Sequence, residues 1–235
     1  PAGLTTLNLG SKFNQPITKH SLPSTLSTLI FGMEHDQPIE VGALPHTLTY
    51  LLFGNNFNQA LPAGTLPDSI TTLSIDGKKF HQPTTSVVLP ISSLIHVIVR
   101  SWDQLVHCKG VPKLTITHAI SYKYVNKFKF DHNVGELLLD APEGYDHNTN
   151  DGIQYAQSLM DMFPNVITIL IKYWRFPKRI ITISIRKLDK DHALRVLNKR
   201  NFPPYSYKPD HTILKWTSVQ RQQQQQQSIN QSLTT

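Results

Sequence analysis

The sequence repeats itself with a period of 22 residues. An apolar residue opens each copy, at Leu4, Leu26, Leu48 and Ile70. A fixed period of about 20 to 50 residues is typical of solenoids, in which one coil cannot bury its own apolar face and stacked coils share a continuous core. The period therefore predicts a mostly β solenoid of stacked 22-residue coils.

Within a copy, the spacing of apolar residues predicts a short strand. Leu4, Leu7 and Leu9 stand at positions i, i+3 and i+5. Side chains alternate along a strand, so Leu7 and Leu9 share the core face while Thr6 and Asn8 point away from it. The same spacing recurs in the following copies, which predicts a buried ladder of Leu7, Leu29, Leu51 and Leu73.

The residues after each strand predict a tight corner. We expect the glycines there to adopt φ values that other residues reach only at a cost; they are Gly10, Gly32 and Gly54. Aromatic rings should then return to the core as a second stack, formed by Phe13, Phe57 and Phe80. The asparagines that follow can hydrogen-bond the corner backbone, and they are Asn14 and Asn58. Leu-Pro pairs close the coils, at 22–23, 44–45, 66–67 and 89–90.

These motifs resemble the FNIP repeat, a 22-residue relative of the leucine-rich repeat. The resemblance rests on Phe-Asn-Gln-Pro-Ile at 13–17, Phe-Asn-Gln at 57–59, Phe-His-Gln-Pro at 80–83 and the recurring Leu-Pro. It covers residues 1–92, which we divide into four copies. The second copy departs from the motif because it has His35-Asp36 in place of Phe-Asn. The fourth has Asp76 where the others have glycine, and one extra residue before Phe80.

The resemblance implies a non-enzymatic scaffold for protein–protein interactions. FNIP-repeat proteins often carry an F-box, or less often a kinase domain, ahead of their repeats. By analogy, the chain is expected to be the substrate-recognition region of a larger cytoplasmic F-box ubiquitin-ligase or signalling protein. Pro1 aligns with Pro23, so we expect the chain to begin within a repeat. Ubiquitin-ligase components would then bind through an upstream domain, and other proteins would bind the repeats.

Beyond residue 92 the repeat becomes irregular, and we divide the remainder into three parts. Residues 93–188 are expected to continue the solenoid in degenerate form, with a short amphipathic helix near 152–163. Residues 189–217 are expected to form a basic C-terminal cap. Residues 218–235 contain a run of glutamines, and such a polar tail cannot bury enough apolar area to offset its ordering entropy. We therefore expect a disordered, polyglutamine-containing tail.

Charge is distributed unevenly along the chain. Residues 165–221 carry a net charge of +10, while residues 1–164 carry −3. The segment 172–200 also contains aromatic residues, and its candidate patch consists of Lys172, Arg175, Lys178 and Arg179. Three readings stay open: a solvated outer face, an acidic protein or other acidic surface, and nucleic acid held by phosphate contacts and base stacking. We rank them in that order.

The outward face of the strands is the candidate protein-binding site. If the i+3 and i+5 residues face the core, the residues beside them form two stripes, and the central candidates are Thr28, Tyr50, Thr72, Ile30, Leu52 and Ile98. Tyr50 is the expected anchor, because tyrosine brings a large contact area at low entropy cost. The alternative is that the irregular residues 100–133 fold over this face and bury it.

The sequence predicts no enzyme, cofactor or metal site. His96, His107 and His118 accompany Cys108, but no paired Cys or His stands at zinc-ligand spacing. The acidic run 146–152 lacks the sixth-position glycine and twelfth-position glutamate of a calcium loop. A single cysteine excludes an intramolecular disulfide. The longest apolar runs are far shorter than the roughly 20 residues of a membrane span, so we expect no membrane partner.

Overall fold

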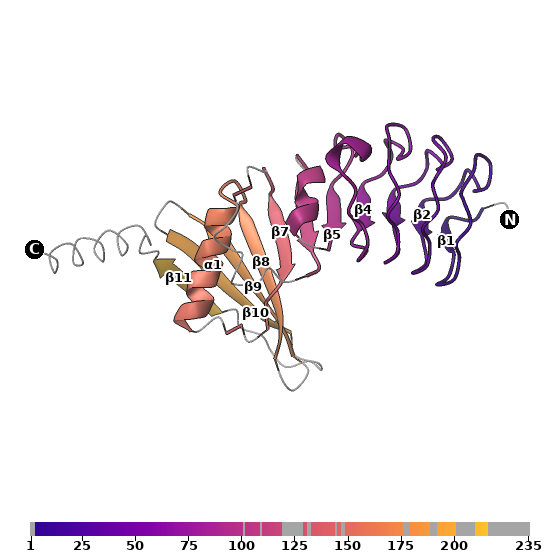
Figure 1. The fold of residues 1–235 in the computed structure, drawn as a ribbon. Coiled ribbons are helices and arrows are strands. Elements are labelled where there is room, and N and C mark those ends of the chain that lie inside the picture. The colour runs from indigo at the N-terminus through magenta and orange to yellow at the C-terminus, as the bar shows by residue number, and fades with distance from the viewer. Residues whose placement is uncertain are drawn as a thin grey trace, which may run out of the picture.

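The computed structural model describes residues 3–100, 102–108, 110–118, 129–130, 133–143, 145–146, 149–175, 179–188, 192–200 and 210–215. These residues form one open sheet whose strands follow one another in chain order (Figure 1). Eight of the described strands form its first part: β1 (Thr6–Asn8), β2 (Thr28–Ile30), β3 (Tyr50–Leu52), β4 (Thr72–Ile75), β5 (His96–Val99), β6 (Lys113–Ile116), β7 (Glu136–Asp140) and β8 (Thr168–Arg175). Three further strands complete it: β9 (Arg179–Lys187), β10 (His192–Arg200) and β11 (Asp210–Lys215). The predicted leucine-rich-repeat-like solenoid is confirmed.

Strands β1 to β8 are parallel, and their i+3 residues form one apolar ladder. The register aligns Leu7, Leu29, Leu51, Leu73, Val97, Leu114, Leu137 and Ile169. All are buried except Leu7, which is half-buried. Leu7 lies on the first described strand, so it packs against a coil on one side only. The predicted ladder is therefore present, with its first member less buried than the others.

The aromatic stack includes a histidine. The ring centroids of Phe13 and His35 lie 5.7 Å apart, those of His35 and Phe57 6.0 Å, and those of Phe57 and Phe80 6.2 Å. All three pairs are stacked. His35 is therefore the ring of the second coil and takes the place that phenylalanine holds in the other coils. Phe31 also stacks on His35 at 4.2 Å, which encloses the imidazole in apolar contacts.

The corner asparagines form the expected hydrogen bonds, and they bond from coil to coil. Asn14 Oδ1 accepts from the Asp36 N–H at 3.0 Å, Asp36 Oδ1 from the Asn58 N–H at 2.9 Å, and Asn58 Oδ1 from the His81 N–H at 3.0 Å. Asp36 serves as well as asparagine because only an acceptor oxygen is needed. The row of hydrogen bonds between coils therefore continues through the second coil, although its sequence departs from the motif.

Of the three corner glycines, Gly10 has the expected positive φ, but Gly32 and Gly54 are required for a different reason. Gly10 has a φ of +78°, but Gly32 and Gly54 are not in the positive-φ region. A Cβ on Gly54 would lie 1.9 Å from the Gly32 carbonyl oxygen, so close stacking of successive corners excludes a side chain. In the fourth coil Asp76 holds the aligned position, and Gly77 makes the close approach: a Cβ on Gly77 would lie 2.6 Å from the Gly54 oxygen.

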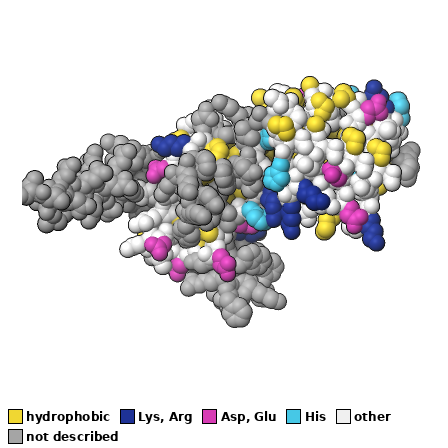
Figure 2. Space-filling view, viewed as in Figure 1, with side chains coloured by type: hydrophobic (Ala, Val, Ile, Leu, Met, Phe, Trp, Pro, Cys, Tyr) yellow, Lys and Arg dark blue, Asp and Glu magenta, His cyan; other side chains and the backbone are white. Residues whose placement is uncertain are grey.

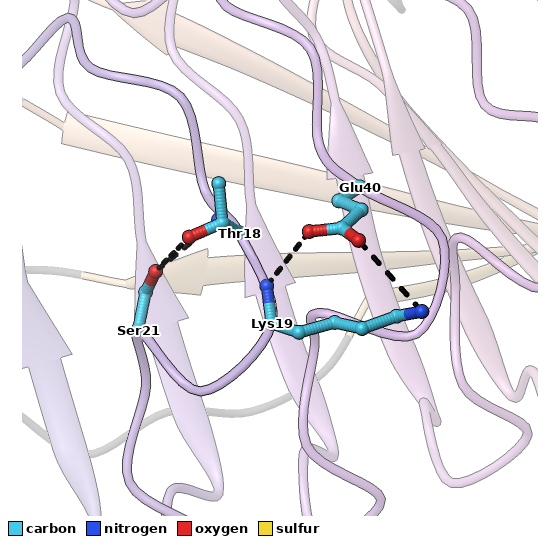
Figure 3. Close-up of polar contacts among 4 residues, drawn as sticks. All are labelled: Thr18, Lys19, Ser21 and Glu40. Atoms are coloured by element: carbon cyan, nitrogen blue, oxygen red, sulfur yellow. Dashed lines mark hydrogen bonds and ion pairs between the residues drawn. The ribbon is translucent and has the colours of Figure 1, made fainter.

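The far side of the coils is linked by further contacts. Ile17 and Ile39 are both buried and form a parallel bridge. Beside this bridge, Glu40 Oε2 accepts from the Lys19 N–H at 2.9 Å, and Glu40 Oε1 lies 3.7 Å from Lys19 Nζ (Figure 3). The Thr18 and Ser21 hydroxyls bond each other within the same turn at 2.8 Å. Polar contacts thus connect the first two coils on the side opposite the strands.

The C-terminal strands correct one prediction. Residues 93–188 were expected to continue the solenoid, but β9 runs antiparallel to β8, and β10 and β11 continue the antiparallel meander. Only residues 176–178 separate β8 from β9. A parallel neighbour would need a crossover of about a dozen residues or more, so a hairpin is the only connection this length permits.

The predicted helix is present as α1, Asn150–Met162. The Thr149 hydroxyl caps it by accepting from the Gly152 N–H at 3.1 Å. Its buried face belongs to the same core as the inward residues of β7 and β8, and it includes Tyr155, Ala156, Leu159 and Met160. Figure 1 shows α1 beside the long C-terminal strands. No helix of the described residues is long and apolar enough to cross a bilayer.

The predicted tail, residues 218–235, lies outside the described residues, as does much of the predicted basic cap, 189–217.

Candidate protein-binding face

Two rows of side chains run across the coils on the face opposite the leucine ladder. The first row consists of Thr6, Thr28, Tyr50, Thr72, His96, Lys113, Glu136 and Thr168. The second row consists of Asn8, Ile30, Leu52, Ser74, Ile98, Thr115, Leu138 and Leu170. Each residue is the register partner of the next one in its row. Because paired strands lie about 4.8 Å apart, successive coils add side chains at a regular interval.

The six candidate residues of the strand face all lie in these rows, within β2 to β5. Tyr50 stands between Thr28 and Thr72 in the first row. In the second row Leu52 stands between Ile30 and Ser74, and Ile98 follows Ser74. All six candidates are half-buried, because neighbours in the row shield one another. Ser74 is buried and donates to Asp76 Oδ1 at 2.8 Å, so it interrupts the apolar row.

Polar groups differ in availability along the first row. Among the described residues, the hydroxyls of Thr28, Tyr50 and Thr72 have no hydrogen-bond partner. Further along, His96 Nε2 is 2.7 Å from Thr115 Oγ1, and Lys113 Nζ is 2.5 Å from Glu136 Oε1. The face thus changes from unbound hydroxyls at β2 to β4 into internally paired groups at β5 to β7.

The imidazole of His96 is also held neutral by its surroundings. Burial lowers its pKa below the ordinary value of 6.5, Lys113 lowers the pKa further, and Glu136 partly offsets both effects. A neutral ring can exchange one hydrogen bond with Thr115 without placing a charge on the face.

The second row extends further than the sequence suggested. Leu138 and Leu170 are half-buried members of it. Val134, Leu137 and Leu139 keep the apolar spacing of the repeat, and alternation along a strand places Leu138 on the face opposite Leu137 and Leu139. The sequence does not show that Leu138 aligns with Ile98 in the second row. The spacing between copies is irregular beyond residue 92, so the register of this strand cannot be predicted from it.

The described parts of segment 100–133 do not support the alternative in which it covers the strand face. The short 3₁₀ helix η2, Trp102–His107, lies at the corner after β5, where Gln104 Nε2 donates to the Phe80 carbonyl at 2.9 Å. Phe130 stacks on Phe163 at 5.2 Å and donates its N–H to the Met162 carbonyl, beside α1. Residues 119–128 lie outside the described part of the chain.

The most exposed apolar side chains of the repeat half lie outside the two rows. Figure 2 shows hydrophobic side chains dispersed among polar ones on the repeat half of the molecule. The most exposed of the described ones on this half are Met33 (55%), Val41 (46%), Val88 (47%), Ile91 (53%) and Ile95 (59%). None belongs to either row, and apolar residues scattered in this way are normal on protein surfaces.

The histidines considered for metal binding do not converge. His96 pairs with Thr115, His107 packs edge-on against Phe80, and His118 accepts a hydrogen bond from Arg100 at 2.7 Å. Burial raises the pKa of the Cys108 thiol to about 12, which disfavours the thiolate that metal binding or nucleophilic attack requires. Within the described ranges, no group of three His, Cys, Asp or Glu side chains is placed to hold a metal ion.

Little of the basic patch can be described. Lys172 is half-buried on β8 and is paired in register with Asp140. Burial raises the pKa of Asp140, and Lys172 opposes that shift. Arg175 and Arg179 are register partners in the β8–β9 hairpin. Lys178 and the side chains of both arginines lie outside the described part, so the patch stays a hypothesis.

Comparisons with known proteins agree with this architecture. The FNIP Repeat family matches in three overlapping stretches, at residues 1–34, 13–56 and 57–98. A solved structure, CroV588, described as a novel circular LRR protein, is similar with a TM-score of 0.50 and 27% identity. The similarity covers 72% of this chain but only 23% of CroV588. No curated protein matches the chain. Residues 1–98 thus match the FNIP Repeat family, and the fold as a whole is similar to a leucine-rich-repeat protein.

Proposed function

We propose that the chain is a non-enzymatic protein-interaction scaffold that binds its partner on the outward face of β2 to β5. FNIP repeats and the LRR-like architecture support a scaffold role. The observation that carries the choice of surface is the arrangement at Tyr50 and Leu52. There, unbound hydroxyls of one row lie directly beside half-exposed aliphatic side chains of the other.

This face can supply apolar contact area and hydrogen-bonding groups that orient a partner. Burying the exposed parts of Ile30, Leu52 and Ile98 would release water from apolar surface. The hydroxyls of Thr28, Tyr50 and Thr72 could then exchange water for partner groups, and such hydrogen bonds fix orientation more than they add affinity. Solenoids use surfaces of this kind because each coil contributes one side chain per row to a continuous platform.

The test is partner capture with the intact chain, followed by affinity measurement on the captured partner. Tyr50→Ala and Leu52→Asp should each weaken binding by about tenfold or more, which corresponds to about 1.4 kcal/mol. Met33→Asp is the matched control, because Met33 is exposed but lies outside both rows. Circular dichroism should show that all three variants are folded. Unchanged binding by both face variants would move the site elsewhere.

The finer role rests on the family resemblance. We propose that the repeats select substrates for a larger cytoplasmic protein that contains an F-box or a signalling domain. Co-precipitation of cullin-complex components with the full-length protein, and partner ubiquitylation that is lost in Leu52→Asp, would support it. Ubiquitylation unaffected by Leu52→Asp would contradict the role assigned to this face.

The net charge of residues 165–221 favours a second candidate, binding of nucleic acid or another acidic surface through segment 172–200. Such binding should weaken steeply with salt, because counterions are released from each neutralised phosphate. A sub-micromolar complex with RNA that is lost on replacing Arg175, Lys178 and Arg179 would place this candidate first.

A further inference from the structure

We infer that the strand face binds an uncharged, predominantly apolar segment of its partner, an inference that rests on the proposed function. The outward residues of β1 to β4 include no Lys, Arg, Asp, Glu or His. They are Thr6, Thr28, Tyr50 and Thr72 in the first row and Asn8, Ile30, Leu52 and Ser74 in the second. This absence contrasts with a chain that carries 23 Lys and Arg and 16 Asp and Glu.

Where charges do enter the two rows, they are already paired. Lys113 and Glu136 form an ion pair across β6 and β7. His96 bonds Thr115, and its lowered pKa keeps it neutral. An incoming charged group would therefore have to break an existing pair to find a counter-charge on this part of the face.

Asp76, directly after β4, is a carboxylate beside the second row, and the Ser74 hydroxyl already donates to it. A charged partner group over β1 to β3 would lose water without gaining a counter-ion. Desolvating an unpaired charge is far more costly than desolvating an apolar group or a neutral hydroxyl. The half-exposed aliphatic residues of the face can pack against apolar side chains of the partner. The hydroxyls that have no partner among the described residues can bond neutral amides, carbonyls or hydroxyls of the partner. The face thus selects against charged segments as well as for apolar ones, and selection by both means is how specific interfaces discriminate.

The proposal separates this face from the basic segment at the other end of the chain. Binding driven by apolar burial depends weakly on salt, because screening acts only on charge–charge interactions. Binding through segment 172–200 would depend strongly on salt. Salt dependence therefore distinguishes the two surfaces before any mutation is made.

The experiment selects random short peptides displayed on phage against the intact wild-type chain. The enriched peptides are synthesised, and their affinities are measured by calorimetry at low and high salt. They should be apolar, without net charge, and their affinities should change by less than about twofold between the two salt concentrations. Leu52→Asp should weaken them by about tenfold or more. Leu52→Met, a control that conserves volume and polarity, should bind nearly as well as wild type.

The outcomes distinguish this inference from the proposed function. Peptides rich in Asp, Glu, Lys or Arg that still lose binding in Leu52→Asp would overturn the inference while leaving the face as the site. Peptides that bind wild type and Leu52→Asp equally would overturn the proposed function as well. Failure to enrich any peptide on the folded wild-type chain would count against both. Thermal melts of the two Leu52 variants, compared with wild type, establish that a loss of binding is not a loss of fold.

Discussion

His35→Phe is expected to stabilise the solenoid and to remove part of its sensitivity to acid. His35 is fully buried, and among the described residues neither ring nitrogen has a hydrogen-bond partner. The neighbouring coils place Phe13 and Phe57 at the equivalent position, stacked on either side of the imidazole. Phenylalanine at position 35 would therefore continue the stack without a buried polar edge.

The magnitude follows from the pKa of the imidazole. Burial lowers the His35 pKa from 6.5 to about 4, and the carboxylate of Asp36 only partly offsets this effect. Since the folded pKa lies below the unfolded value, protonation of His35 costs no stability above pH 6.5, and stability is lost as the pH falls from 6.5 towards 4. One pKa unit corresponds to about 1.4 kcal/mol, so the loss is roughly 2 kcal/mol at pH 5 and about 3 kcal/mol below pH 4.

Urea denaturation of wild type and His35→Phe at pH 7 and pH 5 measures this contribution. At pH 7 the variant should be more stable by about 1 kcal/mol, because it no longer buries unsatisfied nitrogens. At pH 5 its advantage should grow by a further 2 kcal/mol or so. Burial also lowers the pKa values of His96 and His107, so both proteins should lose some stability in acid. The difference between the two proteins isolates His35.

His46→Phe serves as the control, because His46 is exposed and belongs to no stack. It should leave the difference between pH 7 and pH 5 unchanged. If wild type and His35→Phe lose the same stability between these two pH values, the desolvation argument is wrong. If His35→Phe is less stable than wild type at pH 7, the imidazole makes a favourable interaction that the buried, unpartnered geometry does not account for.

Three further substitutions test the contacts between coils, each by urea denaturation of the intact chain at pH 7. Gly54→Ala should destabilise by about 3 kcal/mol, because its Cβ would meet the Gly32 carbonyl; Gly135→Ala, whose Cβ lies 3.4 Å from the Pro112 oxygen, should cost less than about 1 kcal/mol. Asp36→Ala should cost about 1–3 kcal/mol by leaving the Asn58 N–H unbound, whereas Asp36→Asn keeps an acceptor and should stay within about 1 kcal/mol. Thr65→Val should be neutral or gain up to about 1 kcal/mol, because the buried Thr65 hydroxyl has no partner among the described residues. Equal effects of each substitution and its control, or a clear loss in Thr65→Val, would contradict the corresponding contact.

The repeat made the core predictable because every coil meets the same surroundings. A residue at i+3 packs on its counterparts in the coils before and after it, so Leu29, Leu51 and Leu73 needed no structure to be placed. The departures from the motif were harder to judge. His35 and Asp36 looked like defects, yet the first still supplies a flat ring and the second still supplies an acceptor oxygen.

Two features could not be derived from local sequence. A glycine can adopt positive φ and it lacks a Cβ, and the sequence does not show which of these two properties a position needs. At Gly32 and Gly54, close stacking of the corners requires the absence of a Cβ. The direction of a strand is equally hidden. Ile180, Ile183 and Ile185 have the repeat spacing, but the short connection at 176–178 forces a hairpin. The length of that connection becomes visible only when the end of β8 at Arg175 is known.

Variation among the coils of one chain separates what stacking requires from what it leaves free. Ser27, Thr49 and Thr71 each donate a hydroxyl hydrogen to a carbonyl of the preceding coil, and the apolar ladder residues beside them change little. The residues that directly follow Ser27, Thr49 and Thr71 are also aligned from strand to strand. Their side chains nevertheless differ, because the aligned residues are Thr28, Tyr50, Thr72 and His96. Stacking does not dictate these choices, because equivalent coils tolerate different residues. Tyr50, whose hydroxyl has no partner among the described residues, lies beside the half-buried Leu52, and both are therefore free to vary in the way that the proposed binding face requires.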